Sequence, residues 1–137
     1  MKLLVHVIEA RCLPAMDPNG LSDPYVRLQL GKHRSKTKVV KKNLNPYWDE
    51  EFSFRVGDLS EELTVSVLDE DKYIDDFLGQ VKIPLSKVMD ADNLSLGTQW
   101  YQLQPKNKKA KQKDCGIKLS CLFVYFKLIS KWGLSLF

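Results

Sequence analysis

Paired cysteines are missing from this sequence. Its 137 residues include three cysteines, an odd number without the paired spacing of a disulfide framework. A structural zinc site needs four Cys or His ligands at short, regular spacing, and His6 and His33 do not complete one. We therefore expect Cys12, Cys115 and Cys121 to be reduced thiols with structural roles.

Features of a leader peptide or a membrane-spanning helix are also scarce. The apolar opening, 1–5, is cut short by Glu9 and Arg11, and no small-residue cleavage site follows. The stretch 117–137 is largely apolar, but three lysines fall inside it, and a central Lys is costly in a bilayer. We expect a cytoplasmic protein with one domain over 1–126 and an apolar tail over 127–137.

Signatures of catalysis are scarce as well. The sequence has no Gly-rich phosphate-binding loop and no nucleophile elbow. Its DED at 69–71 resembles the metal-binding DxD of nucleotide-sugar transferases, but those enzymes need an α/β domain with long helices. No segment here sustains a helical period for several turns, and one short helix over 85–89 is the most that we expect. The chain is therefore predicted to be non-catalytic.

Short strands are what the sequence does contain. Apolar residues make up 44% and charged residues 28%, which is typical of one globular domain. Runs of β-branched and aromatic residues between turn residues predict seven strands and one short extended piece, over 100–103. This pattern predicts an all-β antiparallel sandwich of at least seven strands. The predicted strands cover 3–8, 25–30, 36–40, 52–56, 63–68, 77–83 and 116–124.

Aspartates gather in two of the predicted loops. Asp17 and Asp23 lie in the first, and Asp69, Asp71, Asp75 and Asp76 lie in the loop after residue 68. If the two loops meet at one end of the sandwich, these carboxylates repel one another unless a cation lies between them. Calcium suits such a flexible oxygen-rich site, whereas magnesium prefers a tighter octahedron. An EF-hand is excluded because Ile74 stands where that loop requires Gly.

Four segments, in this order along the chain, resemble the C2 domain. They are LPAMD at 13–17, SDPYV at 22–26, LNPYWDEEF at 44–52, and DED at 69–71 with DFLG at 76–79. The resemblance covers residues 2 to about 124. It implies an eight-stranded Greek-key sandwich in the family's first-strand (type II) arrangement, with the eighth strand supplied within 127–137. In that family, two loops at one end of the sandwich hold calcium.

The resemblance also implies the calcium ligands. By position, five carboxylates match those of the family, and main-chain carbonyl groups near Met16 and Glu70 are further candidates. The stretch from 71 to 76 is one residue shorter than in the best-known members. This leaves Asp75 and Asp76 as alternatives for the fifth ligand, and it leaves a second calcium ion open. The five matching carboxylates are Asp17, Asp23, Asp69, Asp71 and Asp76.

Basic residues form a run over 32–42. Arg34, Lys36 and Lys38 share one face if this run is extended. Each lysine near an anionic leaflet contributes about 1 kcal/mol to membrane binding. The alternative interpretation is an edge strand whose lysines prevent aggregation. In C2 domains of the protein kinase C and synaptotagmin type, lysines here bind phosphoinositides. Tyr25, Lys36 and Lys38 match that pattern, whereas Leu68 replaces an aromatic residue.

A second basic run covers 106–113. Two interpretations stay open for this run: non-specific electrostatic attraction to phosphate, or a nuclear localisation patch. No aromatic residues interleave with its lysines to stack bases, so no nucleic-acid partner is expected.

Taken with the resemblance, these features predict a module that binds anionic phospholipid membranes when calcium is present, and so becomes a peripheral membrane protein. The alternative is a calcium-independent module that binds a protein or a phosphoinositide. Other domains of a larger chain are further candidate partners.

Overall fold

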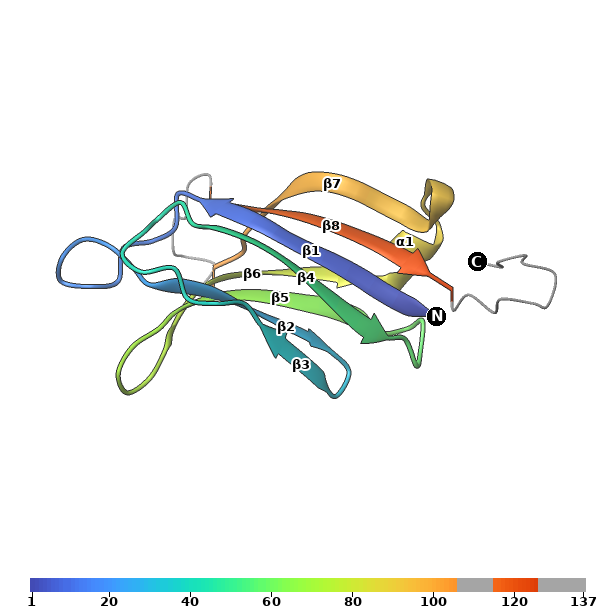
Figure 1. The fold of residues 1–137 in the computed structure, drawn as a ribbon, viewed down its shortest axis with the longest axis horizontal. Helices are drawn as coiled ribbons and strands as arrows, with labels where there is room; N and C mark the ends of the chain where they lie inside the picture. Colours follow the sequence, from blue (N-terminus) through green and yellow to red (C-terminus); the bar gives the residue numbers. More distant parts are fainter. Residues whose placement is uncertain (106–114, 126–137) are drawn as a thin grey trace.

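Two four-stranded antiparallel sheets pack face to face in the computed structural model, which describes residues 1–105 and 115–125 (Figure 1). The elements in chain order are β1 (Lys2–Arg11), β2 (Pro24–Leu30), β3 (His33–Lys36), β4 (Tyr47–Arg55), β5 (Glu62–Asp69), β6 (Asp76–Pro84), α1 (Leu85–Met89), the 3-10 helix η1 (Asp92–Leu94), β7 (Ser95–Gln102) and β8 (Gly116–Val124). One sheet has the strand order β4-β1-β8-β7, and the other has the order β3-β2-β5-β6.

Alternating apolar residues make each strand bury one side. In β1, Leu3, Val5 and Val7 are buried, whereas Leu4 and His6 between them are more exposed. Successive residues of a strand point to opposite faces, so the buried sides of the two sheets form one core. The second sheet contributes in the same way from β2 and β5. Its buried side chains there are Val26, Leu28, Leu30, Leu63, Val65 and Val67.

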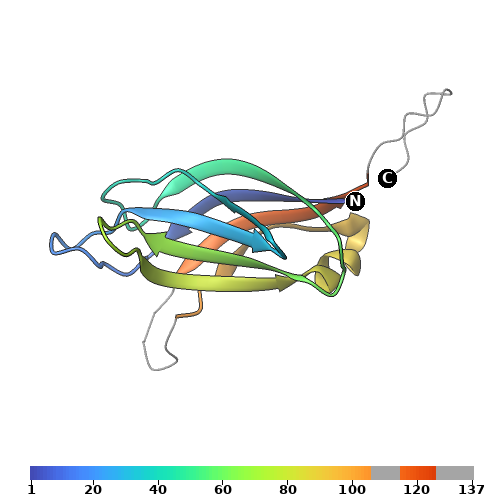
Figure 2. The same cartoon turned by 90° about the horizontal axis from the view of Figure 1, so that it is seen from below.

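Three loops meet at one end of the sandwich, which we call the loop end. Loop 12–23 follows β1, and Pro24 at its close pairs with Asp69, so it lies beside loop 70–75. The third loop, 37–46, joins them through a hydrogen bond from the Val40 N–H to the Pro24 carbonyl. Figures 1 and 2 both place these loops at one end and α1 at the other.

The strand β3 differs from the prediction. It covers His33–Lys36 and not 36–40, because the chain turns back early at Gly31, whose φ of 58° favours glycine. The Thr37 hydroxyl then accepts the hydrogen bond of the Val26 N–H at 2.8 Å, which ends the regular ladder. The expectation that Lys38 shares a strand face with Arg34 and Lys36 is therefore wrong.

The strand β7 also differs, since it extends over Ser95–Gln102 where only 100–103 was predicted. Gly97, with a φ of 65°, lies at a shift in its register with β8 and disturbs the alternation. The described residues thus contain eight strands, with β8 between β1 and β7, and the predicted all-β sandwich is confirmed. The eighth strand does not depend on 127–137, which lies outside the described residues, as does the whole of the basic run 106–113.

The predicted helix over 85–89 is present as α1. In the part of the chain that the structure describes, no helix is long and apolar enough to cross a membrane.

Candidate metal centre

Three aspartates converge at the loop end. Asp17 and Asp23 come from loop 12–23, and Asp69 is the last residue of β5. One carboxylate oxygen of each lies within 4.8 Å of the others. Within 1–105 and 115–125, no other His, Cys, Asp or Glu residues form such a group. The two acidic loops therefore meet, as the sequence predicts.

Asp69 is the most enclosed of the three. Its exposed fraction is 0%, and its Oδ1 accepts a hydrogen bond from the Asp23 N–H at 2.7 Å. Its Oδ2 is also buried, and no hydrogen-bond donor among the described residues reaches it. Buried carboxylate oxygens are normally satisfied, because leaving one without a partner is costly. This atom therefore points to a ligand.

The surroundings of Asp69 raise its pKa to about 6. Burial is the main cause, because it disfavours the charged form, and the nearby carboxylates of Asp17 and Asp23 add to it. The hydrogen bond from the Asp23 N–H acts in the opposite direction. A cation between the three carboxylates would offset both the burial and the repulsion.

Local hydrogen bonds shape the loop that carries Asp17 and Asp23. The Gly20 N–H donates to the Asp17 carbonyl at 3.0 Å, and Gly20 has a φ of 79°, which favours glycine. The Ser22 hydroxyl donates to the Pro14 carbonyl at 2.7 Å and so ties the two arms of the loop together. Both carboxylates are thus presented from a closed turn.

The basic loop 37–46 stabilises this site, and this role was not predicted from the sequence. The Lys42 N–H donates to Asp23 Oδ1 at 2.7 Å, and the Lys41 ammonium lies 2.9 Å from Glu70 Oε1. The Glu70 N–H donates to the Asp23 carbonyl at 2.9 Å and joins the two acidic loops directly. The exposed ion pair contributes little, whereas the two hydrogen bonds that engage Asp23 fix the loops relative to one another. No local sequence signal points to the Lys42 contact, because it uses the main chain.

Asp76 lies directly opposite Asp69. A register shift between Val67 and Leu68 produces this pairing by adding one residue to β6. Asp71 is exposed in the loop that follows β5. Neither Asp71 nor Asp76 belongs to the group within 4.8 Å, although both lie next to it in the chain or across the ladder.

Asp75, the alternative fifth ligand, lies among basic residues. Its Oδ2 accepts a hydrogen bond from the Tyr25 hydroxyl, and its Oδ1 accepts one from the Asp71 N–H at 3.0 Å. The Tyr25 bond is the main cause that lowers the pKa of Asp75, followed by the Asp71 bond and the charges of Lys36 and Arg27. Both oxygens of Asp75 are thus engaged within the protein.

The predicted main-chain ligands lie in the same loops. The Met16 N–H donates to Ser22 Oγ at 3.1 Å, and the Glu70 N–H is used as described above. These bonds fix the two peptide segments, whose carbonyl oxygens stay predicted ligands.

The predicted lipid-binding residues lie on or near the outer face of the β2–β3 hairpin. Lys36 Nζ lies 6.0 Å from the centroid of the Tyr25 ring. Arg34 Nε donates to Gln29 Oε1 at 3.3 Å. Lys38 lies beyond β3, where its N–H donates to Glu50 Oε2 at 2.9 Å. The structure therefore brings Tyr25 and Lys36 together and sets Lys38 apart from the strand.

Arg27 belongs with these residues, although sequence analysis did not single it out. It pairs directly with Lys36 in the β2–β3 register, and directly paired residues share a face. The alternation along 25–30 was the available signal, because it places Arg27 on the side of Tyr25. We call Tyr25, Arg27, Arg34 and Lys36 the basic face.

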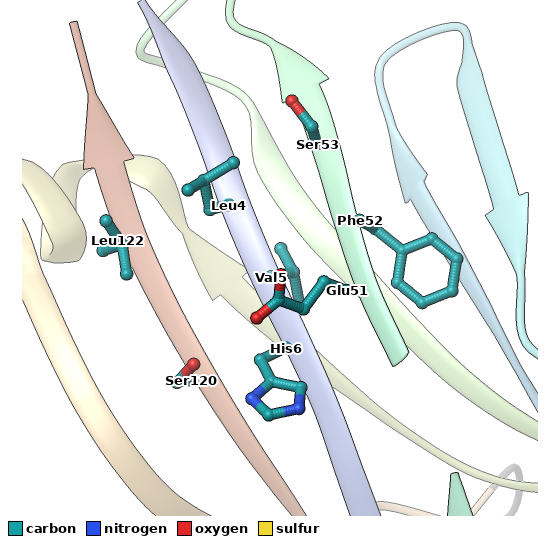
Figure 3. Close-up of a pocket in the computed structure, with 8 residues that line it drawn as sticks. All are labelled: Leu4, Val5, His6, Glu51, Phe52, Ser53, Ser120 and Leu122. Carbon is teal, nitrogen blue, oxygen red and sulfur yellow. The ribbon is translucent and has the colours of Figure 1, made fainter. Parts of the chain in front are cut away.

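A separate hollow of about 330 Å³ lies on the outer face of the other sheet (Figure 3). It is lined from three neighbouring strands, with Leu4 and His6 on β1, Ser120 and Leu122 on β8, and Glu51 on β4. These side chains come from the strands and not from the loop end. The hollow is therefore distinct from the aspartate group.

Comparison with known proteins identifies the family. The family description that matches this sequence is the C2 domain, over residues 1–103. This chain belongs to the C2 domain family. The C2 domain is 71% identical over 117 residues to a C2 and GRAM domain-containing protein of Arabidopsis thaliana, a match that covers 85% of this chain and 11% of that protein. It is 34% identical to extended synaptotagmin-3 of Xenopus tropicalis, with 90% of this chain and 16% of that protein covered.

Solved structures agree with this assignment. A calcium-bound pair of C2 domains from extended synaptotagmin 2 matches with a TM-score of 0.74 and 30% identity, over 88% of this chain and 44% of that one. A single C2 domain of plant extended synaptotagmin 1 also matches with a TM-score of 0.74, at 26% identity, over 90% of this chain and 96% of that one.

The coverage also limits what the matches describe. The C2 domain spans between a tenth and a sixth of the length of these curated relatives. A human cytosolic phospholipase A2 matches over 17% of its chain, so that likeness is confined to one part of the enzyme.

Proposed function

We propose that this C2 domain binds calcium at the loop end and thereby docks on anionic phospholipid membranes. The observation that carries the proposal is the convergence of Asp17, Asp23 and Asp69 within 4.8 Å, around a buried Asp69 oxygen without a described donor. The domain acts as a targeting module and not as a catalyst. It is cytoplasmic and becomes peripheral to the membrane when calcium binds.

The donor atoms fit calcium. The three converging groups are carboxylates, and hard divalent cations prefer oxygen ligands. Asp71 and Asp76 lie beside them and supply further carboxylates from a loop and a strand end. Calcium accepts six to eight oxygens in flexible geometry, whereas magnesium demands a near-ideal octahedron. An extended synaptotagmin 2 structure described as calcium bound, which resembles this domain, supports the same choice.

The charges of the domain account for a calcium-dependent switch. Without a cation, the aspartates at the loop end repel an anionic leaflet, while Lys36 and Arg27 on the basic face attract it. Calcium, when bound, would offset the carboxylate charge and offer coordination positions to lipid phosphate. The apolar tip of loop 70–75 is accessible to the membrane, because Tyr73 and Ile74 are 85% and 80% exposed.

The fifth carboxylate ligand is Asp76 and not Asp75. Asp76 lies opposite Asp69 in the ladder, whereas both oxygens of Asp75 accept hydrogen bonds from the protein. We expect Asp76→Asn to weaken calcium binding by about tenfold or more, because a charged ligand is lost. Asp75→Asn should change it by less than about threefold, measured by isothermal titration. A larger loss in Asp75→Asn than in Asp76→Asn would reverse the assignment.

Two measurements test the function as a whole. Isothermal titration should give saturable heat with calcium and none with an equal concentration of magnesium. Sedimentation with vesicles of phosphatidylserine and phosphatidylcholine should bring the domain down in calcium and leave it in solution with chelator. Equal binding in both conditions would exclude the switch. Absence of calcium heat and of thermal stabilisation by calcium would favour the alternative, a calcium-independent module for a protein or a phosphoinositide.

A further inference from the structure

The basic face holds three hydrogen-bond donors close together. The Tyr25 hydroxyl, the Lys36 ammonium and the Arg27 guanidinium all lie on the outer side of the β2–β3 hairpin. A hydroxyl beside two positive charges can recognise phosphate, which accepts several charge-assisted hydrogen bonds. The sequence alone assigned Tyr25 and Lys36 to lipid, and the fold adds Arg27.

A carboxylate of the same chain already occupies this donor group. Asp75 reaches across from loop 70–75 and accepts the hydrogen bond of the Tyr25 hydroxyl. Lys36 Nζ lies 6.0 Å from the centroid of the Tyr25 ring, and Arg27 pairs directly with Lys36, so both positive charges lie on the face that Asp75 contacts. Tyr25 stays a donor, because burial and Asp75 raise its pKa to about 12.

We propose that Asp75 is an internal competitor that keeps the phosphate of a membrane phosphoinositide away from Tyr25, Lys36 and Arg27. This inference rests on the proposed function, because it presumes that the domain approaches an anionic membrane. A phosphate can enter the donor group only if the Asp75 carboxylate leaves the Tyr25 hydroxyl. Removing the negative charge of Asp75 therefore releases the site.

The position of Asp75 makes such displacement possible. Asp75 directly follows the exposed tip formed by Tyr73 and Ile74, and it is held within its own loop by the Asp71 N–H at 3.0 Å. It belongs to a loop and not to a strand, so its side chain can leave Tyr25 without breaking the sheet. Phosphatidylserine should displace Asp75 poorly, because its headgroup carries less negative charge than that of a phosphoinositide with additional phosphates.

The test compares two substitutions that each remove one negative charge from the same region. Asp75→Asn keeps the side-chain shape and an acceptor oxygen. Glu70→Gln is the matched control, because Glu70 pairs with Lys41 and its side chain makes no described hydrogen bond to Tyr25. Binding is measured in chelator by sedimentation with vesicles of phosphatidylcholine and phosphatidylinositol bisphosphate, and in parallel with soluble inositol trisphosphate and with phosphatidylserine vesicles.

Asp75→Asn should strengthen binding to the phosphoinositide vesicles by about tenfold, because one repulsive charge is lost and a neutral amide oxygen holds the Tyr25 hydroxyl less strongly than the carboxylate does. Glu70→Gln should strengthen it by less than about threefold. Lys36→Gln in the Asp75→Asn background should remove the gain.

Equal gains in Asp75→Asn and Glu70→Gln would overturn the proposal, because general charge would then explain them. An equal gain on phosphatidylserine vesicles, or a gain on soluble inositol trisphosphate alone, would overturn it too. The outcome is separable from that of the proposed function. If the wild-type domain fails to bind phosphatidylserine in calcium but Asp75→Asn gains phosphoinositide binding, the calcium switch fails and the competitor stands.

Discussion

The substitution Asp69→Asn is expected to abolish measurable calcium binding and, in chelator, to stabilise the domain by about 1–2 kcal/mol. The asparagine keeps an acceptor for the Asp23 N–H, which donates to Asp69 Oδ1 at 2.7 Å. It removes a buried charge that lies beside the carboxylates of Asp17 and Asp23. Isothermal titration with calcium and denaturant unfolding in chelator measure the two effects.

The pH dependence of stability gives a second readout of the same residue. The pKa of Asp69 in the folded domain, about 6, is above its ordinary value of 3.8, so the folded state holds a proton that the unfolded state releases. This contribution makes the calcium-free domain more stable as the pH falls through about 6 toward 3.8. Asp69→Asn should lack that gain, which appears as a difference between the two unfolding profiles.

Asp58→Asn is the control for both measurements. Asp58 is exposed between β4 and β5, at the end of the sandwich remote from the loop end. The Asp58→Asn variant should have the calcium affinity of the wild type and the same pH dependence of stability near pH 6. Retained calcium affinity in Asp69→Asn, or a loss of stability in chelator, would contradict the role given to Asp69.

The double substitution Tyr73→Ala with Ile74→Ala is expected to weaken vesicle binding in calcium by about thirtyfold. The two side chains are 85% and 80% exposed at the tip of loop 70–75. Fully burying one apolar side chain contributes about 1.5–3 kcal/mol, so partial insertion of two accounts for about 2 kcal/mol. Vesicle titration at saturating calcium measures the change.

Leu59→Ala is the matched control for this prediction. Leu59 is 42% exposed and lies between β4 and β5, away from the loop end. It should leave vesicle binding unchanged. The double variant should also keep its calcium affinity in solution, because neither side chain is a proposed ligand. Unchanged vesicle binding in the double variant would mean that the tip stays outside the lipid.

The sequence predicts the strands well where alternation is regular. Leu63, Val65 and Val67 fall on one side of β5, and the structure buries all three. It predicts them poorly where a single residue breaks the pattern. Gly97 shifts the register of β7, and the Thr37 hydroxyl replaces a ladder bond after β3. Such effects depend on the neighbouring strand, which a local pattern does not contain.

The candidate site divides in the same way. Aspartates in two loops predict an acidic group, because strand order brings those loops together. The choice between Asp75 and Asp76 is not available from spacing. It depends on the Tyr25 hydroxyl, fifty positions away, and on a register shift in the β5–β6 ladder. Contacts between distant segments that rest on main-chain groups or single hydroxyls leave little trace in the sequence.

The pairing of β1 with β8 determines how this domain would be tethered in a longer polypeptide. Lys2 and Val124 are partners in that ladder, so the start of β1 and the end of β8 lie side by side. These chain ends lie opposite the loop end, because β1 runs from Lys2 toward loop 12–23. If the loop end docks on a lipid surface as proposed, neighbouring segments would attach on the side turned away from that surface and leave the three loops unobstructed.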